Sequence, residues 1–333
     1  MNDTPRVLVT GAAGFAGSHL LEHLSAQGDV AAWSRRDPPQ EVVQLARWKQ
    51  IDLLDRERVR AVIANLRPAF VYHCAGAAHV ARSWKDTTVP LAGNVLTTHY
   101  LLDAIRRAGS PCRVLVTGSA AVYNTSSYPL TEDAPLAPAS PYALSKLAQE
   151  QLGQRALAED GIDVIVARSF NHTGPRQSPA FAAAGMARQI AQIERGDAPP
   201  VIRVGNLDAK RDLTDVRDTV RAYTALMERG LAGTTYNVAS GVARSIRAVL
   251  DALVARSRVA VAIESDPALF RPNDTPIVLG DATRLRAATG WVPLIGFDRM
   301  LDDLLDYWRA SVRLCAAPPT GGRRSPPTSI MKT

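Results

Sequence analysis

Short apolar runs alternate with amphipathic stretches along the first half of the chain. Each run is followed by a segment whose apolar positions recur at helical spacing. This alternation predicts an α/β fold built on a parallel sheet with crossover helices, that is, a Rossmann-like doubly wound sheet. The expected strands are residues 6–10, 30–33, 70–74, 113–116 and 164–167, and the expected helices are residues 17–27, 56–65, 91–107 and 142–159.

The pattern becomes less regular after Arg168, where Pro and Gly become more frequent between the apolar segments. We interpret the second half as a smaller C-terminal substrate domain, with one return of the chain to the first domain. The end of the chain is rich in Pro, Gly and Ser and is expected to be disordered. The predicted units are a Rossmann domain of residues 1–168 with about 212–240, a smaller domain of about 169–211 and 241–313, and a tail of 314–333.

The composition narrows the class of protein. The chain has 333 residues, of which 46% are hydrophobic and 21% charged, as in ordinary globular proteins. We find no apolar run long enough for a membrane span and no secretory signal. Cys74, Cys112 and Cys315 are scattered, which suits a reducing cytoplasm. The net charge of +7 is spread and aromatic residues are only 6%, so a phosphate-bearing small ligand is favoured over nucleic acid.

A glycine-rich turn lies between the first expected strand and the first expected helix. It has the form G-x-x-G-x-x-G, from Gly11 through Gly14 to Gly17. Glycines allow the backbone to approach a pyrophosphate, and the helix N-terminus offers oriented N–H groups. The turn therefore predicts a dinucleotide site that includes Gly11, Gly14, Phe15, Ala16 and Gly17.

The end of the second expected strand indicates which dinucleotide binds. An acidic residue there would hydrogen bond the adenosine ribose and favour NAD. This chain has Ser34, Arg35 and Arg36 instead. Because a guanidinium fork suits a 2′-phosphate, we expect Arg35 and Arg36 to select NADP(H), with NAD(H) as the second possibility.

A second motif carries acid–base chemistry. Tyr142 and Lys146 are four residues apart, which places them on one face of a helix. A phenol has an unperturbed pKa of about 10, and a nearby ammonium and a nicotinamide charge are expected to lower the pKa of Tyr142. Ser119 ends an expected strand, where its hydroxyl would bind the same substrate oxygen. We predict Ser119, Tyr142 and Lys146 as the catalytic residues.

Together these motifs resemble the extended short-chain dehydrogenase/reductases, the group of nucleotide-sugar epimerases, dehydratases and reductases. The resemblance runs from about Arg6 to Arg309. It implies a homodimer and further site residues. Those near the cofactor would be Asp52, Leu53, Ala75 and Ala77, with Tyr142 and Lys146, and those near the sugar would be His79, Ser83 and Ser119.

The second half resembles the GDP-mannose branch of this family. The segments that carry this resemblance are RSFNHTGPRQSP at 168–179, GNL at 205–207, RDLTDVRD at 211–218 and RPND at 271–274. The resemblance implies that the substrate is a GDP-linked sugar, a nucleotide sugar bound by the smaller domain, while the Rossmann domain binds NADP(H). A pyrophosphate needs cationic partners, which agrees with the arginines in these segments. The implied substrate-binding residues are Asn171, Arg176, Arg211 and Arg271.

Within this branch, a dehydratase carries a glutamate two residues after the Ser or Thr of the strand end, because it must remove a proton beside the keto group. Here Ala120 and Ala121 follow Ser119. A reductase needs only a hydride and a proton. We therefore expect NADPH-dependent reduction of the C4 keto group of GDP-4-keto-6-deoxy-D-mannose. The product would be GDP-D-rhamnose, or its C4 epimer GDP-6-deoxy-D-talose, for polysaccharide or O-antigen synthesis.

Three alternatives stay open at this point. A nucleotide-sugar 4-epimerase also lacks that glutamate, although Arg35 and Arg36 argue against it; a GDP-mannose 4,6-dehydratase shares much of the pattern. A non-catalytic NADP-binding regulator would have the same fold, but such relatives often lose the Tyr or Lys. His19, Glu22 and His23 match a zinc-protease pattern, yet their helix must pack on the sheet, so we expect no metal site.

Overall fold

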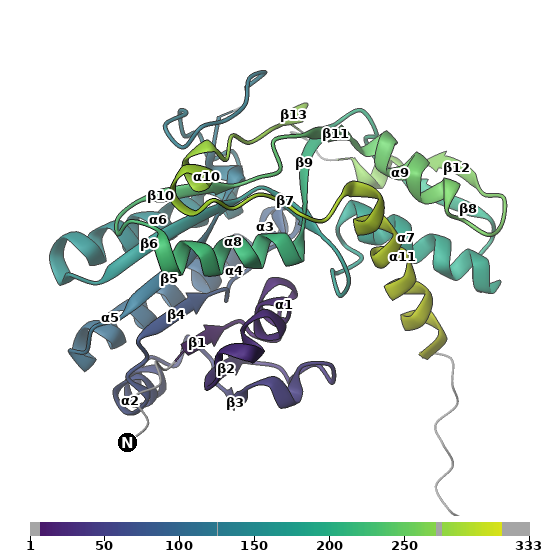
Figure 1. Ribbon diagram of the computed structural model, residues 1–333. Helices are drawn as coiled ribbons and strands as arrows, with labels where there is room; N and C mark the ends of the chain where they lie inside the picture. Colours follow the sequence, from purple (N-terminus) through teal and green to yellow (C-terminus); the bar gives the residue numbers. More distant parts are fainter. Residues whose placement is uncertain (1–6, 125, 271–274, 315–333) are drawn as a thin grey trace, which may run out of the picture.

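The computed structural model describes residues 7–124, 126–270 and 275–314. Its centre is a parallel sheet of seven strands, in the order β10-β6-β5-β4-β1-β2-β3 (Figure 1). The strands are β1 (Val7–Thr10), β2 (Val30–Ser34), β3 (Arg47–Gln50), β4 (Phe70–His73), β5 (Arg113–Ser119), β6 (Asp163–Ser169) and β10 (Thr235–Val238). The predicted doubly wound α/β fold is confirmed.

Strand β3 was not among the predicted strands. Its sequence, RWKQ, contains one apolar residue, and three of its four side chains are exposed. β3 pairs only with β2, at the edge of the sheet. An edge strand of this kind has no buried face that would demand an apolar run, so the hydrophobic pattern does not indicate it.

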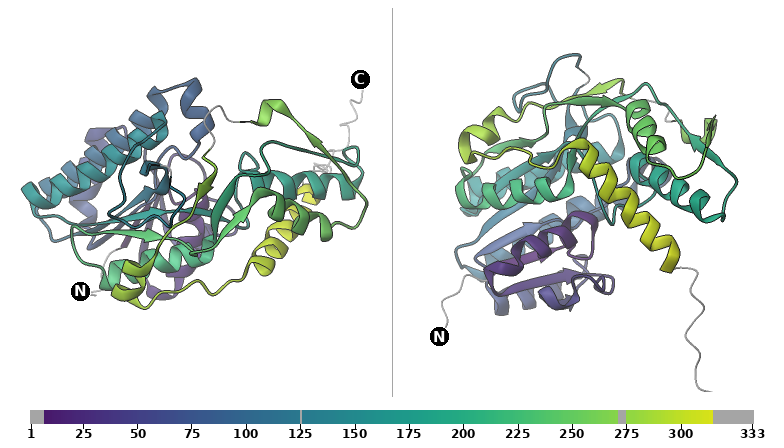
Figure 2. Two further views of the ribbon diagram at one scale, coloured as in Figure 1. Left: turned by 90° about the horizontal axis from the view of Figure 1, so that it is seen from above. Right: turned by 45° about the vertical axis from the view of Figure 1, so that its right-hand side comes forward.

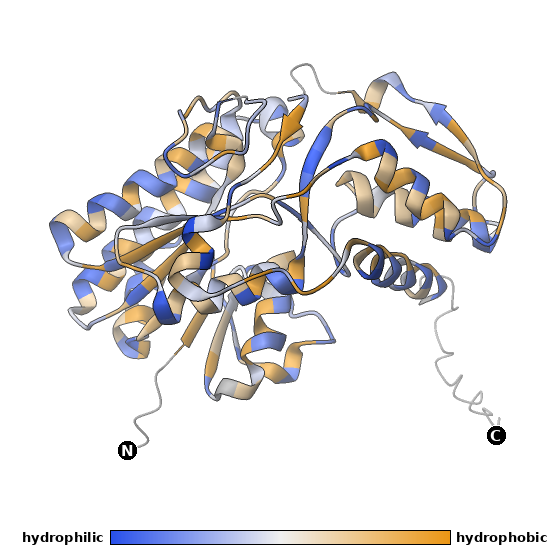
Figure 3. Ribbon diagram, turned by 45° about the horizontal axis from the view of Figure 1, so that its top comes forward, coloured by the Kyte–Doolittle hydropathy of each residue, from blue (hydrophilic) through white to orange (hydrophobic). Residues whose placement is uncertain are grey.

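Helices cover both faces of the sheet. On one face α1 packs against α8, and α8 against α10; on the other α5 packs against α2 and α6. Figure 3 shows the consequence for hydropathy: hydrophobic strands are enclosed by helices that alternate hydrophobic and hydrophilic residues. Each face has its own buried core. The helices are α1 (Phe15–Leu24), α2 (Arg56–Leu66), α5 (Thr97–Ala108), α6 (Pro141–Asp160), α8 (Val216–Arg229) and α10 (Thr283–Thr289).

The helix predicted over residues 91–107 is not uniform. The chain passes through the short helices α3 (Val80–Lys85) and α4 (Thr88–Pro90), then through a π-helical segment, Leu91–Leu96, and continues as α5. The π-helical segment contains Asn94, which is fully buried. π-helical turns are rare and often occur at functional sites. Apolar spacing alone does not predict such a turn.

The second half forms a smaller body beside the large sheet, on the right in Figure 1 and in both views of Figure 2. Three helices pack around a parallel strand pair and bury a third apolar core. A small sheet of four strands lies between this body and the large sheet (Figure 1). The elements are α7 (Ala182–Arg195), α9 (Ile246–Ala255) and α11 (Phe297–Leu314), the pair β8 (Val201–Val204) and β12 (Ala262–Ser265), and the strands β7 (Asn171–Thr173), β9 (Lys210–Asp215), β11 (Ala243–Ser245) and β13 (Ile277–Val278).

None of the helices within the described residues combines the length and the apolar character that a membrane crossing requires.

Candidate functional site

The site lies at the carboxyl ends of the central strands. β1 is flanked by β2 on one side and by β4 on the other, so the strand order reverses at β1. In doubly wound sheets, ligands bind in the crevice at such a reversal. The glycine-rich turn follows β1, the segment around Ala75 follows β4, and Ser119 ends β5. The fold therefore brings the predicted motifs to one edge of the sheet.

The glycine positions of the turn after β1 have no room for side chains. A Cβ at Gly11 would lie 2.6 Å from the backbone of Ala75, and one at Gly17 would lie 2.3 Å from the carbonyl oxygen of Gly11. Gly11 also has a φ of +66°, which glycine adopts without strain. The backbones of the loops after β1 and β4 thus approach each other closely. A pyrophosphate cradle needs such an approach, so the residues present fit a dinucleotide.

Helix α1 begins directly after this turn. Its N-cap is Gly14, which has no side chain to accept from the first-turn N–H groups. These groups include those of Phe15, Ala16 and Gly17, and they have no acceptor within the helix. The N-terminus of α1 is therefore suited to bind an anion.

Arg35 and Arg36 follow β2 and are exposed. Their backbones are fixed: the N–H of Arg36 donates to Ser34 Oγ at 3.0 Å, and Gln50 Nε2 donates to the carbonyl oxygen of Arg35 at 3.0 Å. Within the described part of the chain, neither guanidinium has a hydrogen bond or an ion pair. Both are thus available to an anionic ligand.

Asp52 and Leu53 follow β3. Asp52 is exposed, and its carboxylate accepts from the N–H of Leu54 at 3.0 Å, while Leu53 is buried. After β4, the N–H of Ala75 donates to Thr10 Oγ1 at 3.4 Å, and the N–H of Ala77 donates to Asn94 Oδ1 at 2.8 Å. These bonds fix the backbone on either side of the crevice. The predicted cofactor residues on the segments after β3 and β4 are thus Asp52, Leu53, Ala75 and Ala77.

The three predicted catalytic residues lie together. The phenol of Tyr142 is hydrogen bonded to the Ser119 side chain. Lys146 is one turn further along α6, and its Nζ donates to the carbonyl oxygen of Thr117 at 2.7 Å and to Gln149 Oε1 at 2.8 Å. Lys146 is thus hydrogen bonded to β5 two residues before Ser119. The sheet and α6 together set the geometry of the cluster.

Helix α6 begins where the cluster requires it to. Ser140 is the N-cap, and its hydroxyl accepts from the N–H of Ala143 at 3.1 Å. Pro141 occupies the first helical position, where a missing N–H costs nothing. These two residues fix Tyr142 in the first turn of the helix, beside the end of β5.

The acid–base properties of the cluster differ from one expectation. Burial raises the pKa of Tyr142, and the hydrogen bond from Ser119 opposes this only in part. The lowering expected from the Lys146 ammonium is not found, because burial is the largest influence on the Tyr142 phenol. Burial lowers the pKa of Lys146 to about 8, although Glu150 and Cys74 act in the opposite direction. In this structure Tyr142 is therefore a neutral phenol, and Lys146 is mostly charged at neutral pH.

Two predicted sugar-contacting residues lie on the segment after β4. His79 is half-buried, and its ring stacks on Phe181 with centroids 5.0 Å apart. Burial lowers the pKa of His79, with Arg82 adding to the effect. Ser83 is buried, and its hydroxyl donates to the carbonyl oxygen of Val80 at 2.7 Å. The hydroxyl of Ser83 is thus directed to its own helix α3.

The segment 171–176 lies against the cofactor loop. Asn171 is exposed at the start of β7. The ring of His172 stacks on Phe15 with centroids 5.6 Å apart and an interplanar angle of 7°, and its Nδ1 is 3.1 Å from the carbonyl oxygen of Phe170. The start of α1 and the start of the second half therefore share one aromatic contact.

The same segment is attached to α1 at a second place. His19 Nε2 lies 2.8 Å from the carbonyl oxygen of Pro175, and the guanidinium of Arg176 forms two hydrogen bonds of 2.7 Å with the carboxylate of Glu22. Arg176 is thus paired in this structure and would have to leave Glu22 to meet a substrate. His23 Nε2 lies 3.1 Å from Thr224 Oγ1. Both histidines of the zinc-protease pattern therefore contact other residues of the chain.

Arg211, on β9, is half-buried and donates to the carbonyl oxygens of Lys210 and Thr275 at 2.8 and 2.7 Å. The next residue, Asp212, was not predicted. It is fully buried and accepts hydrogen bonds from the backbone N–H groups of Ser240, Gly241 and Gly280. Asp212 thus ties together the chain segments around β9. The last predicted substrate residue, Arg271, lies outside the described residues.

The chain resembles known proteins over nearly its whole length. Residues 8–304 match the family model described as GDP-mannose 4,6 dehydratase. The chain is 35% identical to the GDP-6-deoxy-D-mannose reductase of Pseudomonas aeruginosa, covering 93% of this chain and 99% of the relative. It is 33% identical to a UDP-glucose 4-epimerase of Azospirillum brasilense, covering 87% and 88%. The solved structure of the enzyme RMD from Pseudomonas aeruginosa, complexed with NADPH, superposes with a TM-score of 0.81 at 34% identity, covering 92% of this chain and 100% of that one.

These matches agree with the site. The glycine-rich turn, the Tyr142–Lys146 pair and the doubly wound sheet all belong to the pattern that was recognised in the sequence. The predicted resemblance to NAD(P)-dependent enzymes of nucleotide-sugar metabolism is confirmed. The chain is an oxidoreductase-type member of the extended short-chain dehydrogenase/reductases and belongs to the GDP-mannose 4,6 dehydratase family.

Proposed function

We propose that the chain reduces the C4 keto group of GDP-4-keto-6-deoxy-D-mannose with NADPH. One observation carries the proposal: Ser119, Tyr142 and Lys146 form a complete cluster, and the position where a dehydratase needs a carboxylate is Ala121. Ala121 lies on the turn that follows β5, and its N–H donates to Ser119 Oγ at 3.2 Å. A methyl group cannot remove a proton from carbon, whereas reduction does not require that step.

The cluster has the protonation state that reduction requires. Bound NADPH would supply the hydride to the carbonyl carbon. Ser119 and Tyr142 would bind the carbonyl oxygen, and Tyr142 would donate its proton to that oxygen as negative charge develops. Because burial raises the pKa of Tyr142, the phenol holds a proton before reaction. The charged Lys146 would then stabilise the phenolate that remains.

The cofactor would be held by the groups described above. The turn from Gly11 to Gly17 and the N-terminus of α1 would bind the pyrophosphate, and Arg35 and Arg36 would bind the 2′-phosphate of NADP(H). The Pseudomonas structure with NADPH supports this choice of cofactor. Asn171 and Arg211, at the ends of the paired strands β7 and β9, are proposed to meet the GDP moiety.

A coupled assay tests the proposal. A separate dehydratase converts GDP-mannose to GDP-4-keto-6-deoxy-D-mannose, and NADPH oxidation is followed by its absorbance. We expect oxidation that depends on the keto sugar, and NMR of the product then distinguishes GDP-D-rhamnose from GDP-6-deoxy-D-talose. If the keto sugar leaves NADPH unchanged, the proposal is wrong. Conversion of GDP-mannose alone, or interconversion of UDP-sugars, would instead identify a dehydratase or an epimerase.

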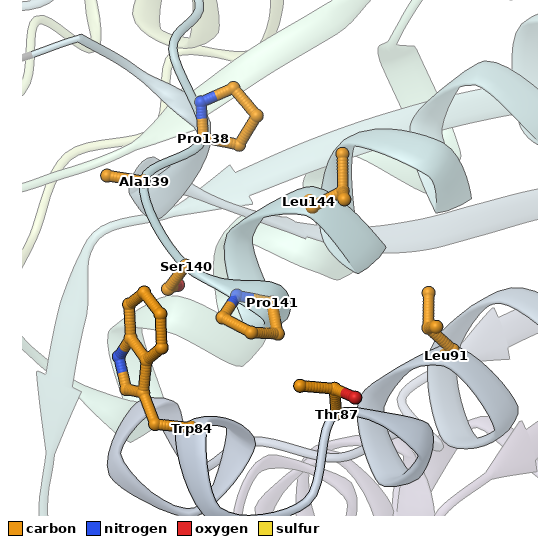
Figure 4. Close-up of a pocket in the computed structure, with 8 residues that line it drawn as sticks. All are labelled: Trp84, Thr87, Leu91, Pro138, Ala139, Ser140, Pro141 and Leu144. Atoms are coloured by element: carbon orange, nitrogen blue, oxygen red, sulfur yellow. The ribbon is translucent and has the colours of Figure 1, made fainter.

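We further propose a homodimer formed through the surface of α3, the π-helical segment and the start of α6. An apolar hollow of about 350 Å³ opens there, lined by side chains on both sides of its mouth (Figure 4). Trp84, Leu91 and Leu144 are 53%, 45% and 53% exposed, and exposed apolar side chains that gather in one place mark interaction surfaces. Light scattering after gel filtration should give twice the chain mass. Leu144→Glu should give monomers, whereas Leu231→Glu, at a site 68% exposed elsewhere, should not.

A reducing cytoplasmic location is proposed on the cysteines. Cys74 and Cys112 are both free thiols in the structure. Secreted proteins usually pair their cysteines, whereas cytosolic proteins keep them reduced.

A further inference from the structure

A hydrogen-bonded network of buried polar side chains leads away from Lys146. Gln149 Oε1 accepts from Lys146 Nζ at 2.8 Å, and Gln149 Nε2 donates to Thr98 Oγ1 at 2.8 Å. Thr98 Oγ1 lies 2.9 Å from His73 Nε2, and His73 Nδ1 lies 2.8 Å from Thr10 Oγ1. All five side chains are buried. They come from β1, β4, α5 and α6, so the contacts form only in the fold.

The direction of each hydrogen bond follows from the donors and acceptors. The Lys146 ammonium has only donors, so the Gln149 amide must direct its oxygen toward it and its NH₂ toward Thr98. Thr98 Oγ1 donates its single proton to the carbonyl oxygen of Asn94 at 2.6 Å. It must therefore accept from both Gln149 and His73. Flipping the amide would place two donors against each other at Lys146.

The other end of this network, at His73 and Thr10, is equally constrained. Burial, and then the charge of Lys146, lower the pKa of His73 to about 3, so the ring is neutral. Its single proton is on Nε2, where it donates to Thr98, and Nδ1 accepts from the hydroxyl of Thr10. Every side chain in the network thus has a fixed role as a hydrogen-bond donor or acceptor. A buried network in which all groups are satisfied is rigid and resists reorientation.

We infer that Gln149 is a positioning residue for Lys146: its side-chain oxygen holds the ammonium in place, and its own amide is anchored through Thr98 to His73. Lysine has a flexible four-carbon stem, and without Gln149 the ammonium would keep only the carbonyl oxygen of Thr117. This inference rests on the proposed catalytic role of Lys146. It adds a residue that the Tyr-x-x-x-Lys spacing does not include.

The test measures Lys146 directly, without cofactor or sugar. The lysines of the chain are Lys49, Lys85, Lys146, Lys210 and Lys332, so NMR of protein labelled with ¹³C-lysine gives few signals, and a Lys146→Arg variant identifies the relevant one. In Gln149→Met the ammonium loses an acceptor, so the Lys146 pKa should fall below that of the native protein. In Gln149→Glu a carboxylate faces the ammonium, so the Lys146 pKa should rise.

The matched control is Gln154→Met, on the same helix, where Gln154 Nε2 donates to the carbonyl oxygen of Gly233 away from the site. It should leave the Lys146 pKa unchanged. The titratable groups that act on Lys146 or are acted on by it are Glu150 on α6, His73 on β4 and Cys74 directly after β4. Unchanged signals of the other labelled lysines separate a direct effect of Gln149 from a general rearrangement.

Turnover provides the second readout. Loss of a hydrogen bond to a charged group should lower kcat for keto-sugar reduction about tenfold to a hundredfold in Gln149→Met. The alkaline limb of its pH profile should move to lower pH, and that of Gln149→Glu to higher pH. Unchanged Lys146 titration in both variants would overturn the inference. If the native protein reduced no keto sugar, the proposed function would fail while the NMR result still decided the role of Gln149.

Discussion

The guanidinium of Arg168 and the carboxylate of Glu150 form an ion pair inside the protein, beside the end of β5 that carries Ser119. Their closest atoms are 2.9 Å apart, and the two side chains are only 7% and 3% exposed. Arg168 also donates to Tyr123 OH at 2.9 Å, and the carboxylate of Glu150 accepts from the backbone of Ser119. The backbone of Ser119 is thus held by the Glu150 carboxylate, which is itself paired with Arg168.

Removing Arg168 should therefore destabilise the protein. Arg168→Met leaves Glu150 buried without its cation, and breaking a buried pair in this way costs about 3–5 kcal/mol in the free energy of unfolding. Burial already raises the pKa of Glu150 above its usual value, with Arg168 opposing this, so the pKa rises further in the variant. A group with a raised folded-state pKa loses stability as pH rises. Urea unfolding should show a larger deficit at pH 8 than at pH 5.

Arg155→Met is the control for that experiment. Arg155 also lies on α6 and forms ion pairs with Glu159 and Asp160, but its side chain is 38% exposed. Its replacement should cost no more than about 1 kcal/mol. A loss of similar size in both variants would contradict the role given to the buried pair.

Tyr142→Phe should separate binding from chemistry. The phenol proton is lost, while the ring that packs at the start of α6 remains. We expect NADPH affinity to stay within a few-fold of the native value and kcat for keto-sugar reduction to fall about 10²- to 10⁴-fold. Tyr128→Phe, at a side chain 78% exposed, should have no effect on either. Near-native turnover of Tyr142→Phe would show that another group donates the proton.

The cofactor preference should depend on Arg35 and Arg36. Replacing both with Ala removes the two unpaired guanidinium groups after β2. We expect the KM for NADPH to rise about tenfold to a hundredfold, as for lost hydrogen bonds to a charged group, with little change for NADH. The double replacement of Arg155 and Arg299 by Ala, at two arginines paired with carboxylates, removes the same two charges and corrects for the change in net charge. Equal losses with NADPH and NADH would mean that these arginines do not read the 2′-phosphate.

The contact between Glu22 and Arg176 predicts a pH dependence. Burial raises the pKa of Glu22, but hydrogen bonds from Arg176 and His19 outweigh this and lower it to about 2. A depressed carboxyl pKa contributes stability above the unfolded value, near 4.5, and that contribution is lost as pH falls toward 2. Glu22→Gln should therefore lose less stability on acidification over this range than the native protein. Thermal unfolding across a pH series measures the difference.

Features that depend on neighbouring residues could be predicted from the sequence. The glycine turn, the Tyr142–Lys146 pair and the alternation of strands and helices are local patterns, and each is where it was expected. Contacts between distant segments could not be predicted in this way. Gln149 meets Thr98 only because α5 and α6 pack on the same face, and Arg176 is 154 residues from Glu22 in the chain. Strand β3 was not predicted, because most of its side chains are exposed at the edge of the sheet and its sequence contains no apolar run.

The π-helical segment, Leu91–Leu96, has a consequence for how this region tolerates change. Asn94 lies within it and joins the loop after β4 to α6, because it accepts from the N–H of Ala77 and donates to Ser145 Oγ at 2.8 Å each. One residue corresponds to about 100° of helix rotation. Deleting any single residue of this turn would restore an ordinary helix and swing Asn94 away from both partners. The segment is therefore more sensitive to a change in length than to conservative substitutions, and insertions or deletions are expected to accumulate elsewhere.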